Sequence, residues 1–327
     1  MLLMALKVLV LLPLSPAQRQ RLEAAAPGAN FVYVADDAAA GAGLSLGALA
    51  TDGQISAADI IVGNLPCDRL NVARNLKLLQ LNSAGYDNYL AAGVLPEGAV
   101  LASAVGAYGQ AVSEHLFAML FSLMKRLPAY RDAQREHTWT DFGPVTTLRD
   151  AQVLVLGCGD IGSHFAQLCQ AMGAHVTGVR RHTGAAPEGF EAVRTMDELP
   201  NLLGKADAVA SFLPSAPSTR KLANDAFFAA MKPGSYFANG GRGNLVDNDA
   251  LVAALNSGHL AGAALDVTDP EPLPVESPLW DAPNVFITPH ISGGFHLPAV
   301  LDNVVSIAAE NIRYLQAGES IRNNVSR

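Results

Sequence analysis

The fold is decided by residues 151–162, which read AQVLVLGCGDIG. Residues 151–156 are apolar apart from Gln152 and predict a buried strand, and the segment from Ile161 to Met172 has the length and pattern of a helix. Between strand and helix the sequence has the spacing GxGxxG, formed by Gly157, Gly159 and Gly162. A bare strand–helix turn in a protein that binds another ligand is the alternative.

Each glycine of this turn has a physical reason. Gly157 permits the tight turn, Gly159 lets the backbone approach a pyrophosphate, and Gly162 lets the helix pack close to the strand. The N–H groups at the helix start, from Asp160 and Ile161 onward, then face the phosphates. The stretch therefore predicts a dinucleotide site on the first strand of a doubly wound sheet.

The next predicted strand, residues 175–179, is followed by Arg180, Arg181 and His182. A site for NAD places Asp or Glu here to accept hydrogen bonds from the ribose hydroxyls. Arginine cannot accept them, but it can bind a 2′-phosphate through charge-assisted hydrogen bonds. We therefore predict that NADP is preferred, with NAD possible. The alternative is that these arginines are surface charges and that NAD binds without its acidic partner.

Short apolar runs alternate with helical segments along both halves of the chain, which predicts parallel sheets covered on both faces. Ser15-Pro16 is typical of a helix start, and Pro128 is expected to end a long helix. We expect further strands over residues 6–12, 31–34, 60–62, 76–81, 208–213, 235–239, 262–266 and 285–288, helices over 18–26, 103–127 and 298–315, and loops over 131–147 and 270–283.

The composition sets limits on function. The chain has 327 residues, is 50% hydrophobic and carries a net charge of -8, which favours two domains and disfavours nonspecific nucleic-acid or anionic-membrane binding. The three cysteines include no CxxC pair, so we expect no disulfide framework, no metal site and a reducing compartment, the cytoplasm. Residues 1–14 could resemble a secretion signal, but Pro13 and Pro16 interrupt the apolar run. No segment is long and apolar enough to predict a membrane span.

Three further segments place reactive side chains after predicted strands, where open α/β sheets carry their sites. Arg242 lies in residues 239–247, Glu271 in residues 265–272, and His290 in residues 288–294.

Together with the glycine turn, these segments resemble the D-isomer-specific 2-hydroxyacid dehydrogenase family, which includes glyoxylate/hydroxypyruvate reductases, D-lactate dehydrogenases and phosphoglycerate dehydrogenases. Most of the chain follows the family's order. The resemblance extends to residues 83–87, 231–234, 251–258, 311–314 and 318–319.

The resemblance implies roles for individual residues. Reduction of a 2-keto acid needs a hydride, a proton and a cation for the carboxylate. His290 resembles the acid/base, and Glu271 its partner, because a carboxylate favours and orients an imidazolium. Arg242 resembles the residue that clamps the substrate carboxylate and polarises the carbonyl. The family also implies carboxylate binding by backbone N–H groups of Ala84 and Gly85.

Asp266 resembles the residue that holds the nicotinamide amide. The family's organisation implies a discontinuous, flavodoxin-like substrate domain of residues 1–101 and 294–327, with a Rossmann domain of residues 102–293 inserted into it. It also implies a homodimer.

The sequence departs from the family in places and leaves alternatives open. Arg180 replaces the usual acid, Leu90 stands where many relatives carry one, and the small pair Gly240-Gly241 predicts a more open nicotinamide pocket. A dinucleotide-sensing corepressor-like protein and a formate dehydrogenase relative share the architecture. The first would not need the catalytic set, and the second has Gln in place of Glu271.

Two other positions keep two interpretations. Trp139 and Arg135 are either an anchor and a solvated charge or specificity residues near a partner or substrate, and His115 is expected to be a packing or hinge residue. The particular 2-keto acid is not encoded in any spacing.

Overall fold

The computed structural model describes residues 5–34, 46–90, 94–182 and 184–325. The chain forms two compact units, one of residues 1–108 and 294–327 and the other of residues 109–293. The first passage between units therefore follows residue 108 and not residue 101. Residues 103–108 stay with the first unit because Ala104 N donates to the Ser83 carbonyl, and the Tyr108 hydroxyl donates to the Asn82 carbonyl.

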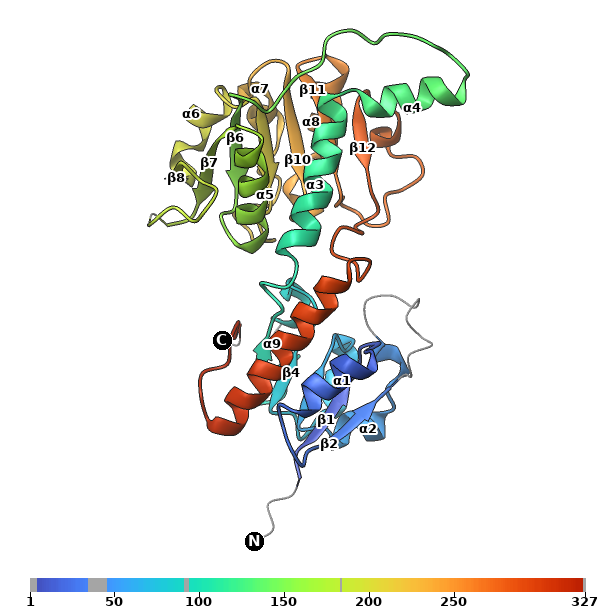
Figure 1. Cartoon of the computed structure of the whole chain (residues 1–327), viewed down its shortest axis with the longest axis vertical. Coiled ribbons are helices and arrows are strands. Elements are labelled where there is room, and N and C mark those ends of the chain that lie inside the picture. Colours follow the sequence, from blue (N-terminus) through green and yellow to red (C-terminus); the bar gives the residue numbers. More distant parts are fainter. Residues whose placement is uncertain (1–4, 35–45, 91–93, 183, 326–327) are drawn as a thin grey trace. The chain divides into compact units, whose positions relative to one another are not determined.

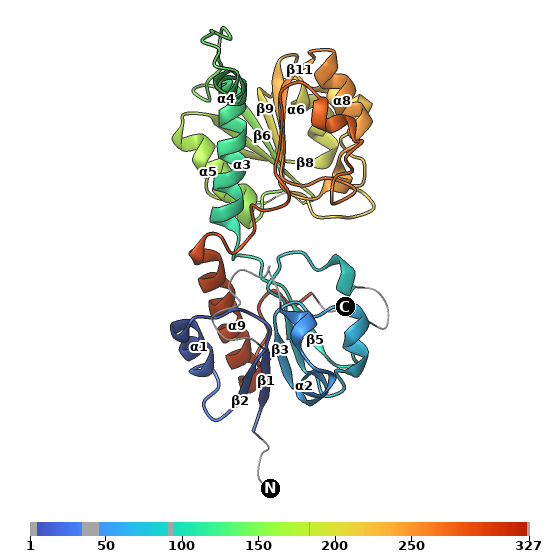
Figure 2. The same ribbon diagram turned by 90° about the vertical axis from the view of Figure 1, so that its right-hand side faces the viewer.

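The first unit is built on a five-stranded parallel sheet in the order β2-β1-β3-β4-β5. Figures 1 and 2 show α1 and α9 on one face of this sheet and α2 on the other. Its strands are β1 (Lys7–Val10), β2 (Asn30–Tyr33), β3 (Ile60–Val62), β4 (Leu78–Gln80) and β5 (Val100–Ala102), and its helices are α1 (Pro16–Glu23), α2 (Asp52–Ala57) and α9 (Pro298–Ala317).

The start of α1 follows the expected signal. The Ser15 hydroxyl accepts from Gln18 N, and the Gln18 side chain accepts from Ser15 N. Pro16 occupies the first turn, where its missing N–H costs nothing.

The core of the first unit contains buried strand side chains, among them Leu9, Ile61 and Leu79. The burial of apolar residues on successive strands explains why the runs predicted at residues 6–12, 60–62 and 76–81 contain β1, β3 and β4, of which the first and last are shorter than predicted.

The second unit is built on a seven-stranded parallel sheet in the order β12-β11-β10-β9-β6-β7-β8. Figure 2 shows α3 and α5 on one face and α6 and α8 on the other. Its strands are β6 (Gln152–Leu156), β7 (His175–Arg180), β8 (Ala192–Thr195), β9 (Ala208–Ser211), β10 (Ser235–Asn239), β11 (Leu260–Leu265) and β12 (Val285–Ile287), and its helices are α3 (Gly109–Met124), α4 (Leu127–Arg135), α5 (Asp160–Ala171), α6 (Leu199–Leu203), α7 (Asp225–Ala230) and α8 (Asn248–Asn256).

Both sheets are parallel at every pairing between named strands, so the expected fold class of two parallel α/β domains is confirmed. The core of the second unit contains Phe227, Phe228 and Phe237, whose rings meet edge to face.

The prediction of one helix over residues 103–127 and a loop from 131 was wrong in its boundaries. α3 begins at Gly109 and ends at Met124, Arg126 adopts a left-handed conformation, and α4 then begins at Leu127. Pro128 lies in the first turn of α4, where proline is tolerated, so it starts a new helix instead of ending an old one.

Helix α4 and the segment that follows it form an arm, residues 127–147. After α4, residues 136–147 of this arm run back toward β6 (Figure 1). Lys125 donates to the Thr146 carbonyl, Arg126 donates to the Pro144 carbonyl, and the Tyr130 ring packs edge to face on Phe142. Trp139 has no such cover and is fully exposed.

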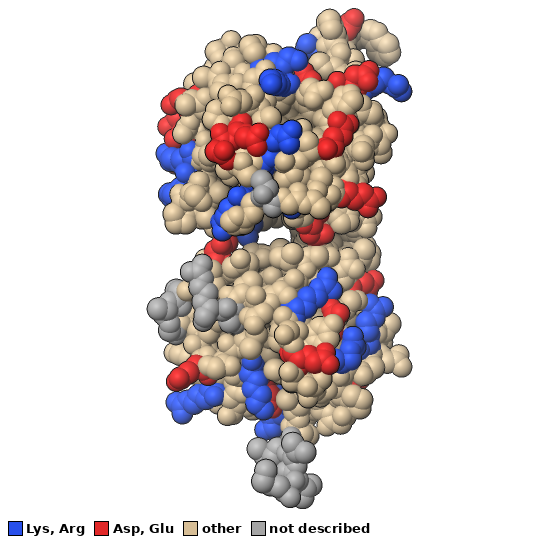
Figure 3. All heavy atoms as spheres, turned by 90° about the vertical axis from the view of Figure 1, so that its left-hand side faces the viewer, with Lys and Arg blue, Asp and Glu red and all other residues tan. Residues whose placement is uncertain are grey.

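Charged side chains of both signs are interspersed on the face drawn in Figure 3. Among the described helices, none is both long enough and apolar enough to cross a membrane.

Candidate active site

Three neighbouring strands of the second unit carry the candidate reactive residues. β10, β11 and β12 lie side by side and are parallel, so their carboxyl ends meet at one edge of the sheet. Arg242 follows β10, Glu271 follows β11 and His290 follows β12. The glycine turn follows β6, which belongs to the same parallel sheet, so it lies at the same edge.

His290 and Glu271 form a direct pair. His290 Nδ1 lies 2.9 Å from Glu271 Oε2, and Glu271 Oε1 accepts from Thr268 N at 3.0 Å. The side chains are 49% and 38% exposed, so a small molecule can reach them from solvent. Because the carboxylate engages Nδ1, Nε2 is the ring nitrogen left to exchange a proton with a substrate. His290 itself has a left-handed backbone, with φ of 51°.

Asp266 is 1% exposed and faces inward. Its Oδ1 accepts from the Thr288 hydroxyl at 2.6 Å and from Ile291 N at 3.0 Å. Its Oδ2 accepts from both Ser292 N and the Ser292 hydroxyl. A nicotinamide amide could bind this carboxylate only if one of these donors moved away. The expected contact between Asp266 and the nicotinamide therefore stays a prediction.

The turn that carries Arg242 is held by Asn239. The Asn239 amide accepts from Gly241 N and donates to the Arg242 carbonyl, while Arg242 Nη1 donates to the Gly241 carbonyl. A Cβ at Gly240 would lie 2.8 Å from Leu116 Cδ2, and one at Gly241 would lie 2.6 Å from the Leu213 carbonyl oxygen. The prediction that these small residues open the pocket was wrong, because neighbouring side chains and backbone fill the space that a Cβ would take.

The glycine turn has the shape that a dinucleotide requires. Gly157 has a φ of 98°, and a Cβ at Gly162 would overlap the Gly157 carbonyl oxygen, so the helix packs directly on the turn. A Cβ at Gly159, in contrast, would meet no atom within 4 Å. That open side, in front of the α5 N–H groups that begin at Asp160 and Ile161, fits a pyrophosphate.

Arg180 ends β7 beside this turn. Its Nη2 donates to the Ala185 carbonyl at 3.0 Å, but its Nε is buried and has no hydrogen-bond partner among the described residues. An unsatisfied buried donor on a cation fits an anionic ligand group such as a 2′-phosphate. Arg181 is exposed next to it.

The candidate carboxylate turn lies in the first unit, after β4. Asn64 N and Asn82 N each donate to the side-chain oxygen of the other asparagine, which locks the ends of β3 and β4 together. The Ser83 hydroxyl donates to the Gly85 carbonyl at 2.6 Å. Within the described chain, no hydrogen bond is donated by the N–H of Ala84 or Gly85, so both groups can donate to a carboxylate.

Several site residues have only a weak signal in the sequence. Asn64, Asn239 and Thr288 act through contacts with residues that are distant in sequence or through a specific backbone turn. The usable signal is that each lies at or just after the end of a predicted strand, which also describes many structural residues.

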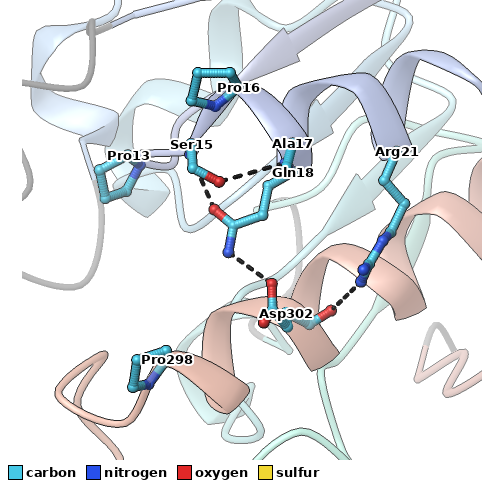
Figure 4. Close-up of a pocket in the computed structure, with 8 residues that line it drawn as sticks. All are labelled: Pro13, Ser15, Pro16, Ala17, Gln18, Arg21, Pro298 and Asp302. Carbon is cyan, nitrogen blue, oxygen red and sulfur yellow. Dashed lines mark hydrogen bonds between the residues drawn. The ribbon is translucent and has the colours of Figure 1, made fainter.

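The pocket shown in Figure 4 lies between α1 and the start of α9. Gln18 Nε2 donates to Asp302 Oδ1 at 2.8 Å across it, and Arg21 Nη1 donates to the Ser306 hydroxyl. Its polar groups already bond to one another, and the pocket contains none of the candidate catalytic residues.

Comparison with known proteins gives the family. Residues 117–292 match the family model described as "D-isomer specific 2-hydroxyacid dehydrogenase, NAD binding domain". A glyoxylate/hydroxypyruvate reductase B from Citrobacter koseri is 34% identical over 251 residues, which cover 75% of this chain and 76% of the relative. The chain spans about half of the length (48%) of the mycobacterial D-3-phosphoglycerate dehydrogenases that it also matches at 32% identity.

Solved structures extend the match to nearly the whole chain. A D-isomer specific 2-hydroxyacid dehydrogenase from Xanthobacter autotrophicus Py2, in complex with NADPH and MES, has a TM-score of 0.78 at 31% identity, with 98% of each chain covered. An NADPH-dependent glyoxylate/hydroxypyruvate reductase from Sinorhizobium meliloti, in complex with NADP and sulfate, has a TM-score of 0.78 at 27% identity, again with 98% of each chain covered.

The family model and these relatives show that the chain belongs to the D-isomer specific 2-hydroxyacid dehydrogenase family, and the glycine turn and the residues at this edge of the sheet agree with it. It is an NAD(P)-dependent oxidoreductase that acts on the CH–OH group of its donors.

Proposed function

We propose that this chain is a D-2-hydroxyacid dehydrogenase that reduces a small 2-keto acid, with NADPH as the preferred reductant. The observation that carries the proposal is the His290–Glu271 pair, 2.9 Å apart, at the sheet edge that also carries the glycine turn. Glyoxylate and hydroxypyruvate are the first substrates to test, because they appear in the names of relatives from Citrobacter koseri and Sinorhizobium meliloti.

The bound cofactor supplies the hydride for the carbonyl carbon. His290 holds a proton at Nε2 and gives it to the carbonyl oxygen, while Glu271 holds Nδ1 and stabilises the charged ring. Arg242 binds the substrate carboxylate and polarises the carbonyl. The N–H groups of Ala84 and Gly85, in the first unit, are carboxylate-binding groups by the family resemblance. In the oxidative direction His290 takes the proton from the hydroxyl.

The cofactor set is the glycine turn with its helix start, Asp160 and Ile161, together with Arg180 and Arg181. Support for NADP comes from Arg180 Nε, which has no hydrogen-bond partner within the described part of the chain, and from the arginine in place of an acid at the end of β7. Two related structures that hold NADPH or NADP support it as well.

We also propose a cytoplasmic homodimer. Cys67, Cys158 and Cys169 are free thiols, which suits a reducing compartment. The fully exposed Trp139 on the arm is the kind of side chain that a second subunit would cover. Sedimentation equilibrium measures the mass, and a monomer at micromolar concentration would contradict the dimer.

The decisive experiment measures turnover of a panel of 2-keto acids with NADPH and NADH in parallel. His290→Ala should lower kcat by roughly 10²- to 10⁴-fold, because the proton donor is lost. NADPH affinity, measured by fluorescence titration, should change by less than about twofold, since the histidine acts on the substrate. His175→Ala is the matched control, because His175 also pairs with a carboxylate, Glu191, but at the opposite end of β7.

Unaltered turnover in His290→Ala would remove the histidine from the mechanism. Tight NADPH binding with no turnover of any keto acid by the native chain would point to a dinucleotide-sensing binding protein instead. Turnover of formate would point to a formate dehydrogenase relative, which shares the same architecture.

A further inference from the structure

His115 lies on α3 and reaches the end of β12. Its Nε2 is 3.0 Å from Thr288 Oγ1 and 3.7 Å from Asp266 Oδ1. The imidazole is 27% exposed, so α3 and the strand ends largely enclose it. The histidine therefore contacts the segment that carries His290, although the two histidines are far apart in sequence.

The hydrogen-bond directions in this contact follow from the groups present. The Thr288 hydroxyl has one proton, and its 2.6 Å contact with Asp266 Oδ1 uses that proton, because an ionised carboxylate only accepts. Thr288 Oγ1 must then accept from His115 Nε2, which makes His115 the donor at the start of a relay. Met119 Sδ also lies 3.5 Å from Thr288 Oγ1, but a thioether is a weak acceptor, so the shorter contact with the Asp266 carboxylate takes the hydroxyl proton.

The relay ends at His290. Asp266 Oδ1 and Oδ2 accept the N–H groups of Ile291 and Ser292, which follow His290, and the Asp266 carbonyl accepts the N–H of His290 at 2.7 Å. Residues 288–292 thus wrap around one buried carboxylate. This wrapping holds the left-handed backbone of His290 at both sides. Glu271 holds the imidazole ring, and the Asp266 contacts hold the backbone that carries the ring.

We propose that His115 is a positioning residue for the reaction. It donates to Thr288, fixes the hydroxyl that orients Asp266, and through Asp266 fixes the loop that presents His290. The proposal rests on the proposed role of His290 as the acid. Because a misplacement of about 1 Å can cost up to about a hundredfold in rate, we expect loss of this donor to slow the reaction without weakening cofactor binding.

The test compares His115→Leu, which removes the donor, with His115→Gln, whose amide nitrogen can donate in the same place. His115→Leu should lower kcat about tenfold and leave the KM of the keto acid within about twofold. His115→Gln should restore most of the lost rate. Dissociation constants for NADPH from fluorescence titration and melting temperatures are measured for both variants, and His175→Leu is the surface control.

A double-mutant cycle separates positioning from stability. In the His290→Ala background His115→Leu should change the residual rate by less than about twofold, since no acid remains to be positioned. Thr288→Val should match His115→Leu, and the two substitutions together should cost no more than one. A similar rate loss with and without His290, or native kcat in His115→Leu, would overturn the positioning role. If His290→Ala itself keeps native turnover, the proposed function fails, and that result is distinct from either outcome.

Discussion

At the scale of single residues, Arg180 is the most specific marker of the cofactor. Among the described residues the buried Nε has no hydrogen-bond partner, while Nη2 donates to the Ala185 carbonyl. If a 2′-phosphate satisfies this donor, Arg180→Gln should raise the KM of NADPH by about tenfold or more, the value expected for one charge-assisted hydrogen bond of about 1.5–3 kcal/mol. The KM of NADH should stay nearly constant, because NADH has no phosphate at that place. Initial-rate kinetics with both cofactors measure the difference.

The matched control is Arg194→Gln on the neighbouring strand β8. Arg194 is an exposed arginine that pairs with Glu198, and we assign it no role in binding. An equal loss with both cofactors in Arg180→Gln, or a clear NADH preference in the native chain, would mean that Arg180 is structural.

The candidate site residues could be proposed from the sequence, but the hydrogen bonds that hold them in place could not. His290, Glu271 and Arg242 fall within short motifs that follow strands, and the resemblance of these motifs to the family implies the reaction. The four hydrogen bonds that hold Asp266 join residues 22 or more positions away along the chain and depend on the left-handed backbone at His290. No local pattern encodes such contacts. They appear only when β11 and β12 lie side by side.

At the scale of elements, the strand–turn–helix unit contains two glycines with opposite requirements. Gly159 has a φ of -89°, which alanine can adopt, and its Cβ would meet only open space. Gly159→Ala should therefore change the free energy of unfolding by less than about 1 kcal/mol. NADPH affinity should fall by about tenfold or more, which is about 1.4 kcal/mol, because the methyl group occupies the place where the pyrophosphate meets the backbone.

Gly162→Ala should act on the stability of the fold first, and on NADPH binding only through that loss. Its methyl group would overlap the Gly157 carbonyl oxygen, so the variant should lose about 1–3 kcal/mol of stability before any cofactor is added. Chemical unfolding and NADPH titration of both variants separate the two effects. Gly53→Ala in α2, where a Cβ is unhindered, is the control. Equal destabilisation by Gly159→Ala and Gly162→Ala would contradict this division of roles.

Element boundaries were predictable only where local signals act alone. The strands at residues 60–62 and 235–239 end where expected because apolar runs and glycine or proline neighbours define them. The break between α3 and α4 was missed, since Pro128 is compatible both with the end of one helix and with the first turn of another. The chain breaks at Arg126, whose left-handed backbone ends α3 before α4 begins. The Arg126 side chain donates to the Pro144 carbonyl on the segment that returns to β6, and this contact stabilises the break.

At the scale of the whole molecule, both ends of the chain belong to one unit. After α9, the final segment returns to β5, where Val325 N donates to the Leu101 carbonyl and Asn323 Nδ2 donates to the Val105 carbonyl. Buried Asn311 on α9 donates to Gln80 on β4 and accepts from Arg322 N. The first unit is therefore closed by residues more than 200 positions from its sheet, which the order of strands alone does not reveal.

Buried and half-buried thiols and phenols with raised pKa values are spread over both units, so the stability of the whole chain should fall at alkaline pH. Burial raises the pKa of the Cys158 thiol to about 11 and that of Cys169 to about 12, and it also raises the pKa values of Tyr89 and Tyr108. In the unfolded chain thiols titrate near about 8.5 and phenols near about 10. Unfolding then releases protons above about pH 8.5. The contribution of these groups to the free energy of unfolding should therefore be constant just below that pH and should fall as pH rises toward the folded pKa values.

Thermal unfolding between pH 7 and pH 10.5 measures this dependence. Cys169 is the best single probe because it is fully buried in α5 and its pKa rises through burial alone. Cys169→Ala should unfold at a lower temperature at pH 7, because a cavity is left, but its melting temperature should fall less steeply with pH than that of the native chain. Cys158 and Cys169 lie in the second unit, and Tyr89 and Tyr108 lie in the first. If the two units unfold in separate thermal transitions, both transitions should shift at alkaline pH. Only the transition of the second unit should respond to Cys169→Ala. A native melting temperature that is flat or rising up to pH 10.5 would contradict the assignment of these groups as buried neutral acids.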